Sequence, residues 1–141
     1  MKLQAKPLQR IELTIPIRWA PGQIRHGRGY TFWPKTTRRY REALSASLAA
    51  LHDGECIDEG PVRVELDFIR PRPKSAAKRE WFTVRPDLDN LEKPTLDCMT
   101  GVFFADDAQV VEKTTRKAYG DSWSLRIVVE EIEQVTLRGL V

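Results

Sequence analysis

One stretch in the second half of the chain carries the residues best suited to chemistry. Asp87 and Asp89 lie two residues apart, Lys93 follows four residues after Asp89, and the pair Asp106 and Asp107 comes after a further short segment. Two like charges held side by side repel each other unless a positive group lies between them. The simplest such group is a hard divalent cation with oxygen ligands, such as Mg²⁺. The pattern therefore suggests a metal site.

The local geometry follows from the strand period of two. In an extended segment, Asp87 and Asp89 project from one face while Leu88 points to the core. One of Asp106 and Asp107 supplies a third carboxylate if the intervening helix folds the chain back. Carboxylate clusters hold one or two Mg²⁺ ions, which bind a scissile phosphate and activate water for in-line displacement.

Lys93 has two interpretations. Its ammonium group can stabilise charge in the transition state of phosphate hydrolysis. Alternatively, it forms a surface salt bridge with Asp89 or Asp97, which contributes little to stability. Asp-x-Asp by itself is a weak signal, because acidic pairs also occur in calcium loops and in solvated turns.

The rest of the chain predicts the elements that position this stretch. Apolar residues alternate with polar ones in segments typical of strands, and they recur at helical spacing in two others. The expected strands are Gln9 to Trp19, Pro61 to Ile69, Gln109 to Tyr119 and Trp123 to Val129, with a short extended segment at Trp81 to Val84. The expected helices run from a cap at Thr36 or Thr37 to about His52, and from Leu91, capped by Asp89 or Asn90, to Met99.

Three local signals refine this outline. Pro16 cannot donate to a ladder, so the first strand is expected at a sheet edge or poorly paired near its end. Gly120 and Asp121 predict a hairpin that joins the last two strands. Pro94 is tolerated near a helix start, so the second helix is expected to begin irregularly or later than Leu91. The fold class is α/β (α+β): a mixed sheet with two main helices on one face, in a single domain spanning residues 1–141.

Two clusters of basic residues precede the acidic stretch in the sequence. The chain has 141 residues and a net charge of +3, with basic clusters in residues 25–41 and 70–79. A basic surface around an acidic site suits a phosphate polymer. The loop at residues 20–34 also carries aromatics, which either stack on exposed bases or fold back onto the core. The candidate DNA contacts are Arg28, Arg38, Lys78, Arg79 and Arg85.

Other classes of protein find no support in the sequence. No run of about 18 apolar residues predicts a transmembrane helix, and no apolar segment follows the basic residues of Met1 to Arg10, so we expect no secretory signal. Cys56 and Cys98 are far apart and are expected to be reduced thiols. His26 and His52 lack zinc-ligand spacing.

Two strings of the acidic stretch together resemble the RusA family of Holliday junction resolvases. They are DLDNLEKPTLD, from Asp87, and GVFFADDAQVV, from Gly101. The strong similarity covers about a quarter of the chain, and the paired motif is far more specific than either half. The resemblance implies a small, homodimeric, Mg²⁺-dependent endonuclease of bacteria and prophages, acting on branched DNA in the cytoplasm, in recombination and repair.

The same resemblance assigns roles to individual residues. Asp87, Asp89 and Asp107 correspond to the family's metal-binding aspartates, and Lys93 corresponds to the lysine needed for cleavage. Asp106 is a weaker candidate for coordination. The chain departs from the family in the loop at residues 21–32, which lacks the usual Pro-Pro pair followed by asparagine and tyrosine, so no DNA contact is carried over from there.

The sequence therefore predicts an endodeoxyribonuclease that resolves four-way junctions by paired nicking. One alternative is a metal nuclease that acts on forks, flaps or general duplex. Another is a protein that binds branched DNA without cutting it, although such a protein is expected to have lost an acid or the lysine. The last is a small domain whose acidic turns serve solubility alone, which does not explain why the acids and Lys93 fall in this pattern.

Overall fold

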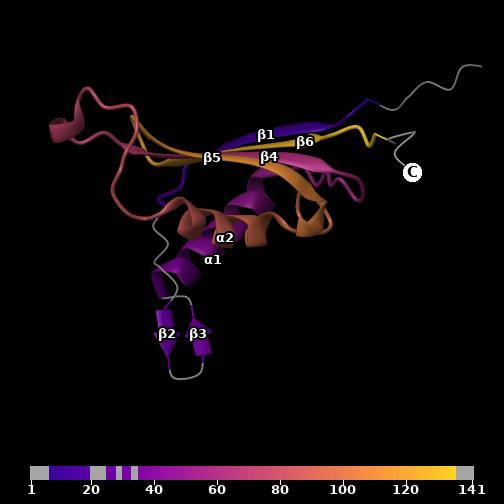
Figure 1. The fold of residues 1–141 in the computed structure, drawn as a ribbon, viewed down its shortest axis with the longest axis horizontal. Coiled ribbons are helices and arrows are strands. Elements are labelled where there is room, and N and C mark those ends of the chain that lie inside the picture. The colour runs from indigo at the N-terminus through magenta and orange to yellow at the C-terminus, as the bar shows by residue number, and fades with distance from the viewer. Residues whose placement is uncertain (1–6, 20–24, 28–29, 33–34, 136–141) are drawn as a thin grey trace, which may run out of the picture.

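The computed structural model describes residues 7–19, 25–27, 30–32 and 35–135, and it contains a four-stranded sheet with two long helices (Figure 1). The main elements are β1 (Arg10–Ile15), α1 (Lys35–Leu51), β4 (Val62–Pro71), α2 (Leu88–Met99), β5 (Val110–Gly120) and β6 (Ser124–Glu131). Two short strands, β2 (Arg25–Gly27) and β3 (Tyr30–Phe32), form a separate hairpin, and two 3₁₀ turns, η1 (Lys74–Ala76) and η2 (Asp107–Gln109), complete the order.

The strand order in the main sheet is β1-β6-β4-β5. β4 pairs with β5 in parallel and with β6 antiparallel, and β6 pairs antiparallel with β1. This mixed sheet with two main helices confirms the predicted fold class. β1 lies at an edge and ends at Ile15, immediately before Pro16, as the missing donor of that proline predicts.

The predicted hairpin between the last two strands is wrong, because β4 lies between β5 and β6. Gly120 does not form a tight hairpin turn. It is the last residue of β5, paired with Pro71 of β4. A Cβ atom at Gly120 would lie 2.6 Å from a side-chain carbon of Ile69, so glycine permits the close approach of the two strands.

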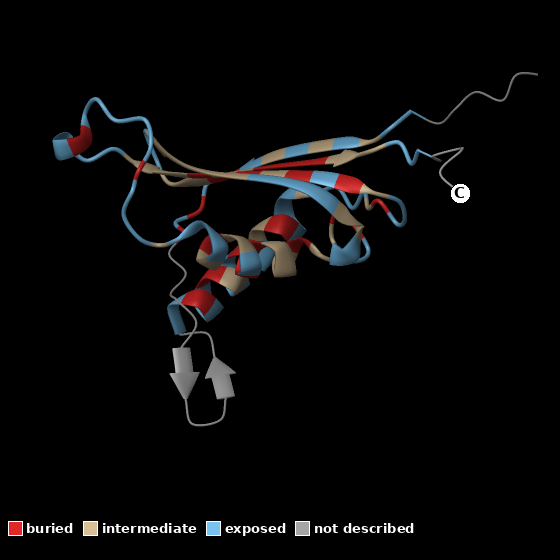
Figure 2. Ribbon diagram, in the orientation of Figure 1, coloured by how far each residue is buried: buried red, intermediate tan, exposed pale blue. Residues whose placement is uncertain are grey.

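Both helices cover one face of the sheet, and the buried residues lie between these layers (Figures 1 and 2). The central strands β4 and β6 contribute alternate residues to this core, as the strand period predicts, whereas no residue of the edge strand β5 is buried. The two helices are joined by a hydrogen bond of 2.7 Å between the buried hydroxyl groups of Tyr40 and Thr95. The largest fully buried side chains are Trp19, Phe68, Phe82, Phe103 and Phe104.

Charged residues cover the opposite face. Arg116 of β5 contacts Glu65 and Asp67 of β4, and Arg126 of β6 contacts Asp67 at 2.9 Å and Glu12 of β1 at 2.9 Å. These cross-strand ion pairs alternate with core residues such as Leu66, which lies on the helix side. Acids and bases are therefore balanced on this face.

Both helices begin earlier than predicted. α1 begins at Lys35, so Thr37 lies inside the first turn, where it is buried, and does not cap the helix. α2 begins at Leu88 and contains the buried Pro94 in its interior. A proline there removes one helical hydrogen bond, and the burial of its ring offsets part of that cost.

Two expected loops also contain short elements. Residues 20–34 include the β2–β3 hairpin, and residues 70–80 include η1. In the segment from Trp81 to Val84, Trp81 alone forms a β-bridge, to Ala118. The placement of the aromatics in the loop at residues 20–34 lies outside the described side chains. No described helix is long and apolar enough to cross a membrane.

Candidate active site

The first two aspartates lie at the N-terminus of α2. Asp87 is the residue before the first turn, and Asp89 lies within that turn. The two residues do not belong to a strand, and Leu88 is 39% exposed, so the predicted extended geometry with a buried Leu88 is wrong. The helix starts early because Asp87, in an extended conformation (φ −72°, ψ 155°), suits the position before a helix.

Asp87, Asp89 and Asp107 are exposed. Within the described residues, none of the three carboxylates forms a hydrogen bond or an ion pair, and Asp87 makes no side-chain cap bond to the helix. The neighbouring acids are paired, since Glu92 contacts Lys113 at 2.8 Å and Asp97 contacts Lys93 at 3.0 Å. The carboxylates that match the motif are thus available to a ligand, unlike Glu92 and Asp97 on the same helix.

Lys93 is exposed on α2, one turn after Asp89. Its ion pair with Asp97 spans four residues of the helix, and its side chain is 59% exposed. Such a pair contributes little to stability and breaks easily. The salt bridge considered from the sequence therefore exists, and it leaves Lys93 able to exchange Asp97 for another anion.

The two adjacent aspartates of η2 differ in their contacts. The side chain of Asp106 accepts a hydrogen bond of 2.9 Å from the backbone of Ala108, while its own backbone donates to the Gln109 side chain. This reciprocal pair is a capping box. Asp107 has no such bond and lines a shallow pocket with Leu96 and Lys113.

The three free carboxylates do not gather within one chain. Asp107 lies beside Leu96, and a rise of 1.5 Å per residue places Leu96 about 10 Å along α2 from Asp89. Among the described residues, no three histidine, cysteine or acidic side chains are arranged to hold a metal ion. The donor chemistry fits Mg²⁺, whereas the assignment of Asp87, Asp89 and Asp107 to one site stays a prediction.

Lys117 is a residue near the first aspartates that sequence reasoning treated only as part of a strand. Its ammonium group donates to the backbone carbonyls of Val84 (2.9 Å) and Pro86 (3.0 Å), which flank the cis Arg85–Pro86 bond before Asp87. Burial lowers the pKa of Lys117, Asp87 raises it and Arg70 lowers it further. No local signal in the sequence marks these contacts, because Val84 and Pro86 lie more than 30 residues before Lys117.

The candidate DNA contacts lie on separate segments. Arg38 is exposed in the first turns of α1, Lys78 and Arg79 are exposed after η1, and Arg85 is exposed two residues before Asp87. In the described part of the chain, the structure does not bring these four side chains together at one place. Arg28 lies outside the described residues.

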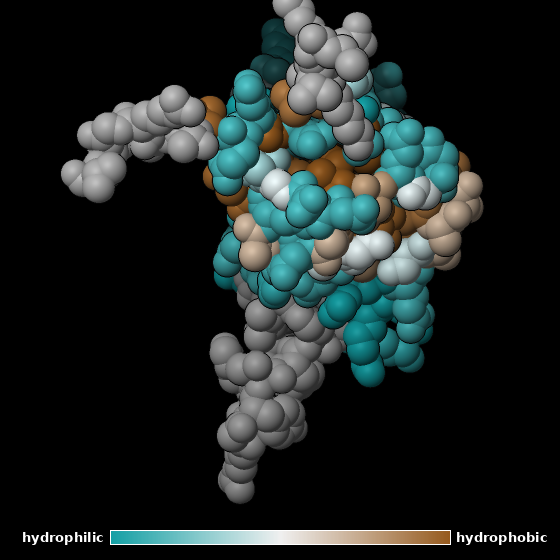
Figure 3. Space-filling model, turned by 90° about the vertical axis from the view of Figure 1, so that its right-hand side faces the viewer, coloured by the Kyte–Doolittle hydropathy of each residue, from teal (hydrophilic) through white to brown (hydrophobic). Residues whose placement is uncertain are grey.

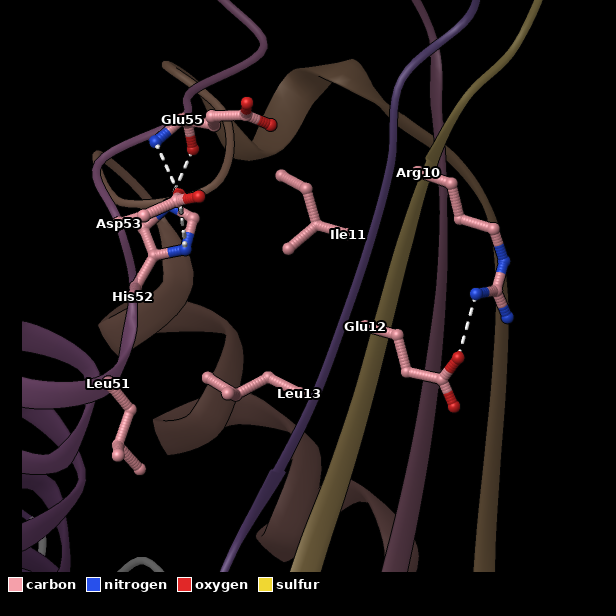
Figure 4. Close-up of a pocket in the computed structure, with 8 residues that line it drawn as sticks. All are labelled: Arg10, Ile11, Glu12, Leu13, Leu51, His52, Asp53 and Glu55. Carbon is pink, nitrogen blue, oxygen red and sulfur yellow. Dashed lines mark hydrogen bonds and ion pairs between the residues drawn. The ribbon is translucent and has the colours of Figure 1, made fainter.

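Other hollows of the surface lie away from Asp87. A pocket of about 240 Å³ between β1 and the turn after α1 is lined by paired groups, including Arg10 with Glu12 and His52 with Asp53 (Figure 4). Cys56 and Cys98, both half-buried and free, line a second pocket beside the ends of α1 and α2. At the end of the molecule shown in Figure 3, hydrophilic residues surround a hydrophobic hollow.

Comparison with known proteins identifies the family. Residues 18–130 match the family model described as Endodeoxyribonuclease RusA. The crossover junction endodeoxyribonuclease RusA of Enterobacteria phage 82 is 32% identical over 107 residues, covering 71% of this chain and 76% of the phage protein. The protein of the same name from Lactococcus phage r1t is 29% identical over 92 residues, covering 64% of this chain and 70% of its own.

A further relative has no assigned activity. The uncharacterized protein YqaN of Bacillus subtilis is 29% identical over 122 residues, covering 79% of this chain and 85% of its own length. The family match includes α2, η2 and every strand of the sheet except β1 and the last residue of β6. The chain therefore belongs to the RusA family of endodeoxyribonucleases.

Proposed function

We propose that this protein cuts four-way DNA junctions as a Mg²⁺-dependent homodimer, in bacterial recombination and repair. Two relatives are named crossover junction endodeoxyribonucleases, which supports the choice of substrate. The observation that carries the proposal is the set of unpaired carboxylates at Asp87, Asp89 and Asp107, in a surface where neighbouring acids are paired. The bacterial and phage origin of the relatives supports action in the bacterial cytoplasm.

Each residue of the motif has a chemical task in this proposal. Asp87, Asp89 and Asp107 would hold Mg²⁺, which supplies Lewis acidity toward a phosphate oxygen and lowers the pKa of water. Lys93 exchanges its weak pair with Asp97 for an oxygen of the scissile phosphate and stabilises the developing charge. Lys117 fixes the backbone that enters α2 and thereby orients Asp87.

The separation of the carboxylates supports a dimer. Asp87 and Asp89 lie at one end of α2, and Asp107 lies near the other. In a two-fold dimer, the same surface of both copies meets, and an element that crosses the axis at a right angle lies antiparallel to its copy. If two copies of α2 lie antiparallel across the axis, each Asp107 approaches the Asp87 and Asp89 of the partner. Two such composite sites suit the nicking of two strands.

Cleavage of synthetic DNA tests the proposal. The purified protein is expected to nick a fixed four-way junction in Mg²⁺, at two symmetrically placed positions, and to leave it intact in EDTA. A linear duplex of the same sequence is expected to be cut far more slowly. Equal cleavage of the junction and the duplex would show that the protein does not prefer junctions. Faster cleavage of forks or flaps than of junctions would show that those structures are its substrate.

The substitution Asp89→Asn tests the site. It removes one metal-binding charge while keeping the side-chain volume, so cleavage is expected to fall by at least about a hundredfold, as it does when a key electrostatic contact is removed. Junction binding is expected to persist, because phosphate repulsion by the carboxylate is also removed. Full cleavage by the folded variant in Mg²⁺ would show that the site has been placed wrongly.

A further inference from the structure

At one end of the sheet, three aromatic rings form a rigid platform. Trp19 stacks on Phe82 with ring centroids 5.4 Å apart, and its edge meets Trp123 at 4.9 Å. The indole Nε1 of Trp19 donates to the backbone carbonyls of Ile69 (3.0 Å) and Ser124 (3.1 Å). Trp19 and Phe82 are fully buried, whereas Trp123 is partly exposed. The platform therefore presents Trp123 at the surface.

Two arginines lie on this platform. The guanidinium carbon of Arg18 is 5.2 Å from the centre of the Trp123 ring, and that of Arg70 is 5.4 Å from Trp123 and 5.5 Å from Phe82. Cation–π contacts at these distances orient the guanidinium groups. Both arginines are thus held in place by rings that are themselves fixed.

The charges of these arginines are not neutralised. Within the described part of the chain, neither Arg18 nor Arg70 has a carboxylate within salt-bridge distance, although Arg63, Arg116 and Arg126 on the same sheet all do. The buried Nε of Arg70 also has no hydrogen-bond partner. A buried donor without a partner is unfavourable, so the Arg70 guanidinium has hydrogen-bonding capacity that the protein does not use. Positive charge and an unused donor together favour an anionic ligand.

This cationic platform adjoins the candidate active site. Lys117 lies over the Phe82 ring of the platform, with its ammonium nitrogen 4.7 Å from the centre of that ring. The same ammonium group binds the carbonyl of Pro86 and interacts electrostatically with both Arg70 and Asp87. A strand of DNA that reaches Asp87 therefore passes near the platform.

We propose that Arg18 and Arg70, held on Trp123 and Phe82, bind backbone phosphates of the DNA strand that enters the Asp87 side of the molecule. This inference rests on the proposed function. The ligand is phosphate and not a base, because the guanidinium groups already occupy the ring of Trp123. Phosphate contacts position a nucleic acid without reading its sequence. The site therefore contributes to affinity for junction and duplex alike.

The salt dependence of binding measures such contacts. Arg18→Gln, Arg70→Gln and the double variant are compared with the wild-type protein for binding to a four-way junction and to a duplex in EDTA, where no cleavage occurs. Each lost phosphate contact reduces the slope of log K against log salt by about 0.9. We expect that reduction for each single variant, about twice that for the double variant, and an equal loss of affinity for both DNAs.

Arg63→Gln is the matched control. Arg63 lies on the same strand as Arg70 but is paired with Glu112 at 2.9 Å and Glu130 at 3.3 Å. This variant is expected to keep the wild-type slope. Arg70→Lys, which keeps the charge, is expected to retain most of the slope, and thermal melting confirms that each variant is folded.

The outcomes separate this inference from the proposed function. If the wild-type protein binds and cuts junctions while the glutamine variants keep its slope and affinity, the arginines only cover the aromatic core and the inference is wrong. That result would appear as a lowered melting temperature with unchanged binding. If the wild-type protein neither binds nor cuts DNA, the proposed function fails, and the phosphate site fails with it.

Discussion

Asp106 and Asp107 are adjacent in sequence, but their carboxylates differ in their contacts. Asp106 accepts a hydrogen bond from the backbone of Ala108 and closes the capping box of η2 with Gln109. Asp107 is exposed and has no partner among the described residues. At the scale of single residues, the structure therefore favours Asp107 as the ligand, as its position in the motif also does.

Two substitutions test this division. Asp107→Asn is expected to abolish nicking of a junction in Mg²⁺, because it removes a metal-binding charge. Asp106→Asn is expected to keep most of the activity, because the asparagine side-chain oxygen can still accept the cap hydrogen bond. Single-turnover cleavage and thermal melting are the measurements. An inactive but folded Asp106→Asn protein beside an active Asp107→Asn protein would reverse the assignment.

At the scale of elements, β5 is the strand that connects the sheet to α2. Lys113 of β5 contacts Glu92 on α2, and Lys117 holds the carbonyls of Val84 and Pro86 before the helix. β5 thus contacts both the helix and the segment that leads into it. The position of Asp87 depends on these long-range contacts as well as on the helix itself.

Lys117→Met tests this positioning role. Methionine keeps an apolar side chain of similar length over Phe82 but removes the ammonium group that holds the two carbonyls. We expect the single-turnover cleavage rate to fall about tenfold or more, since small displacements of catalytic groups have large effects on rate. The affinity for the junction in EDTA is expected to stay within about twofold, because on this view Lys117 contacts protein and not phosphate.

Arg116→Met provides the control for Lys117. Arg116 lies on the same strand but on the opposite face of the sheet, where it pairs with Glu65 and Asp67. Its cleavage rate is expected to match the wild type. If Lys117→Met instead weakens binding and lowers the salt slope by about one, Lys117 contacts phosphate directly. An unchanged rate would remove Lys117 from the site altogether.

At the scale of the whole molecule, the distribution of carboxylates along α2 makes a composite site testable. Two differently tagged chains, one with Asp89→Asn and the other with Asp107→Asn, are purified as a mixed dimer. If each site takes Asp107 from the partner, one site of the mixed dimer contains both altered residues and the other is intact. The mixed dimer is then expected to nick one strand of a junction, whereas neither variant alone cuts.

The control for this experiment is a mixed dimer of wild type with Asp89→Asn, which is expected to nick under either arrangement. If that dimer is active and the doubly altered pair is inactive, each site is built within one chain. Under that arrangement, α2 and η2 must rearrange when metal binds. A protein that stays monomeric at all concentrations, yet cuts junctions, would remove the dimer from the proposal.

The sequence by itself determined the motif, the family and most of the elements. Local apolar patterns identified α1, β1, β4, β5 and β6, because side-chain periodicity depends on neighbours along the chain. The acidic motif identified the family because its two strings, which begin at Asp87 and Gly101, occur together; the overall composition did not identify it. Its expected strand geometry was wrong, because an aspartate in an extended conformation also suits the position before a helix.

Only the tertiary structure decided what lies beside what. The pair Gly120 and Asp121 predicted a hairpin, but β5 pairs in parallel with β4, which lies between β5 and β6 in the sheet. Lys117 and Arg18 contact rings and carbonyls that lie more than 30 residues away in the sequence. Contacts of that kind depend on packing between distant segments, and no local pattern records them.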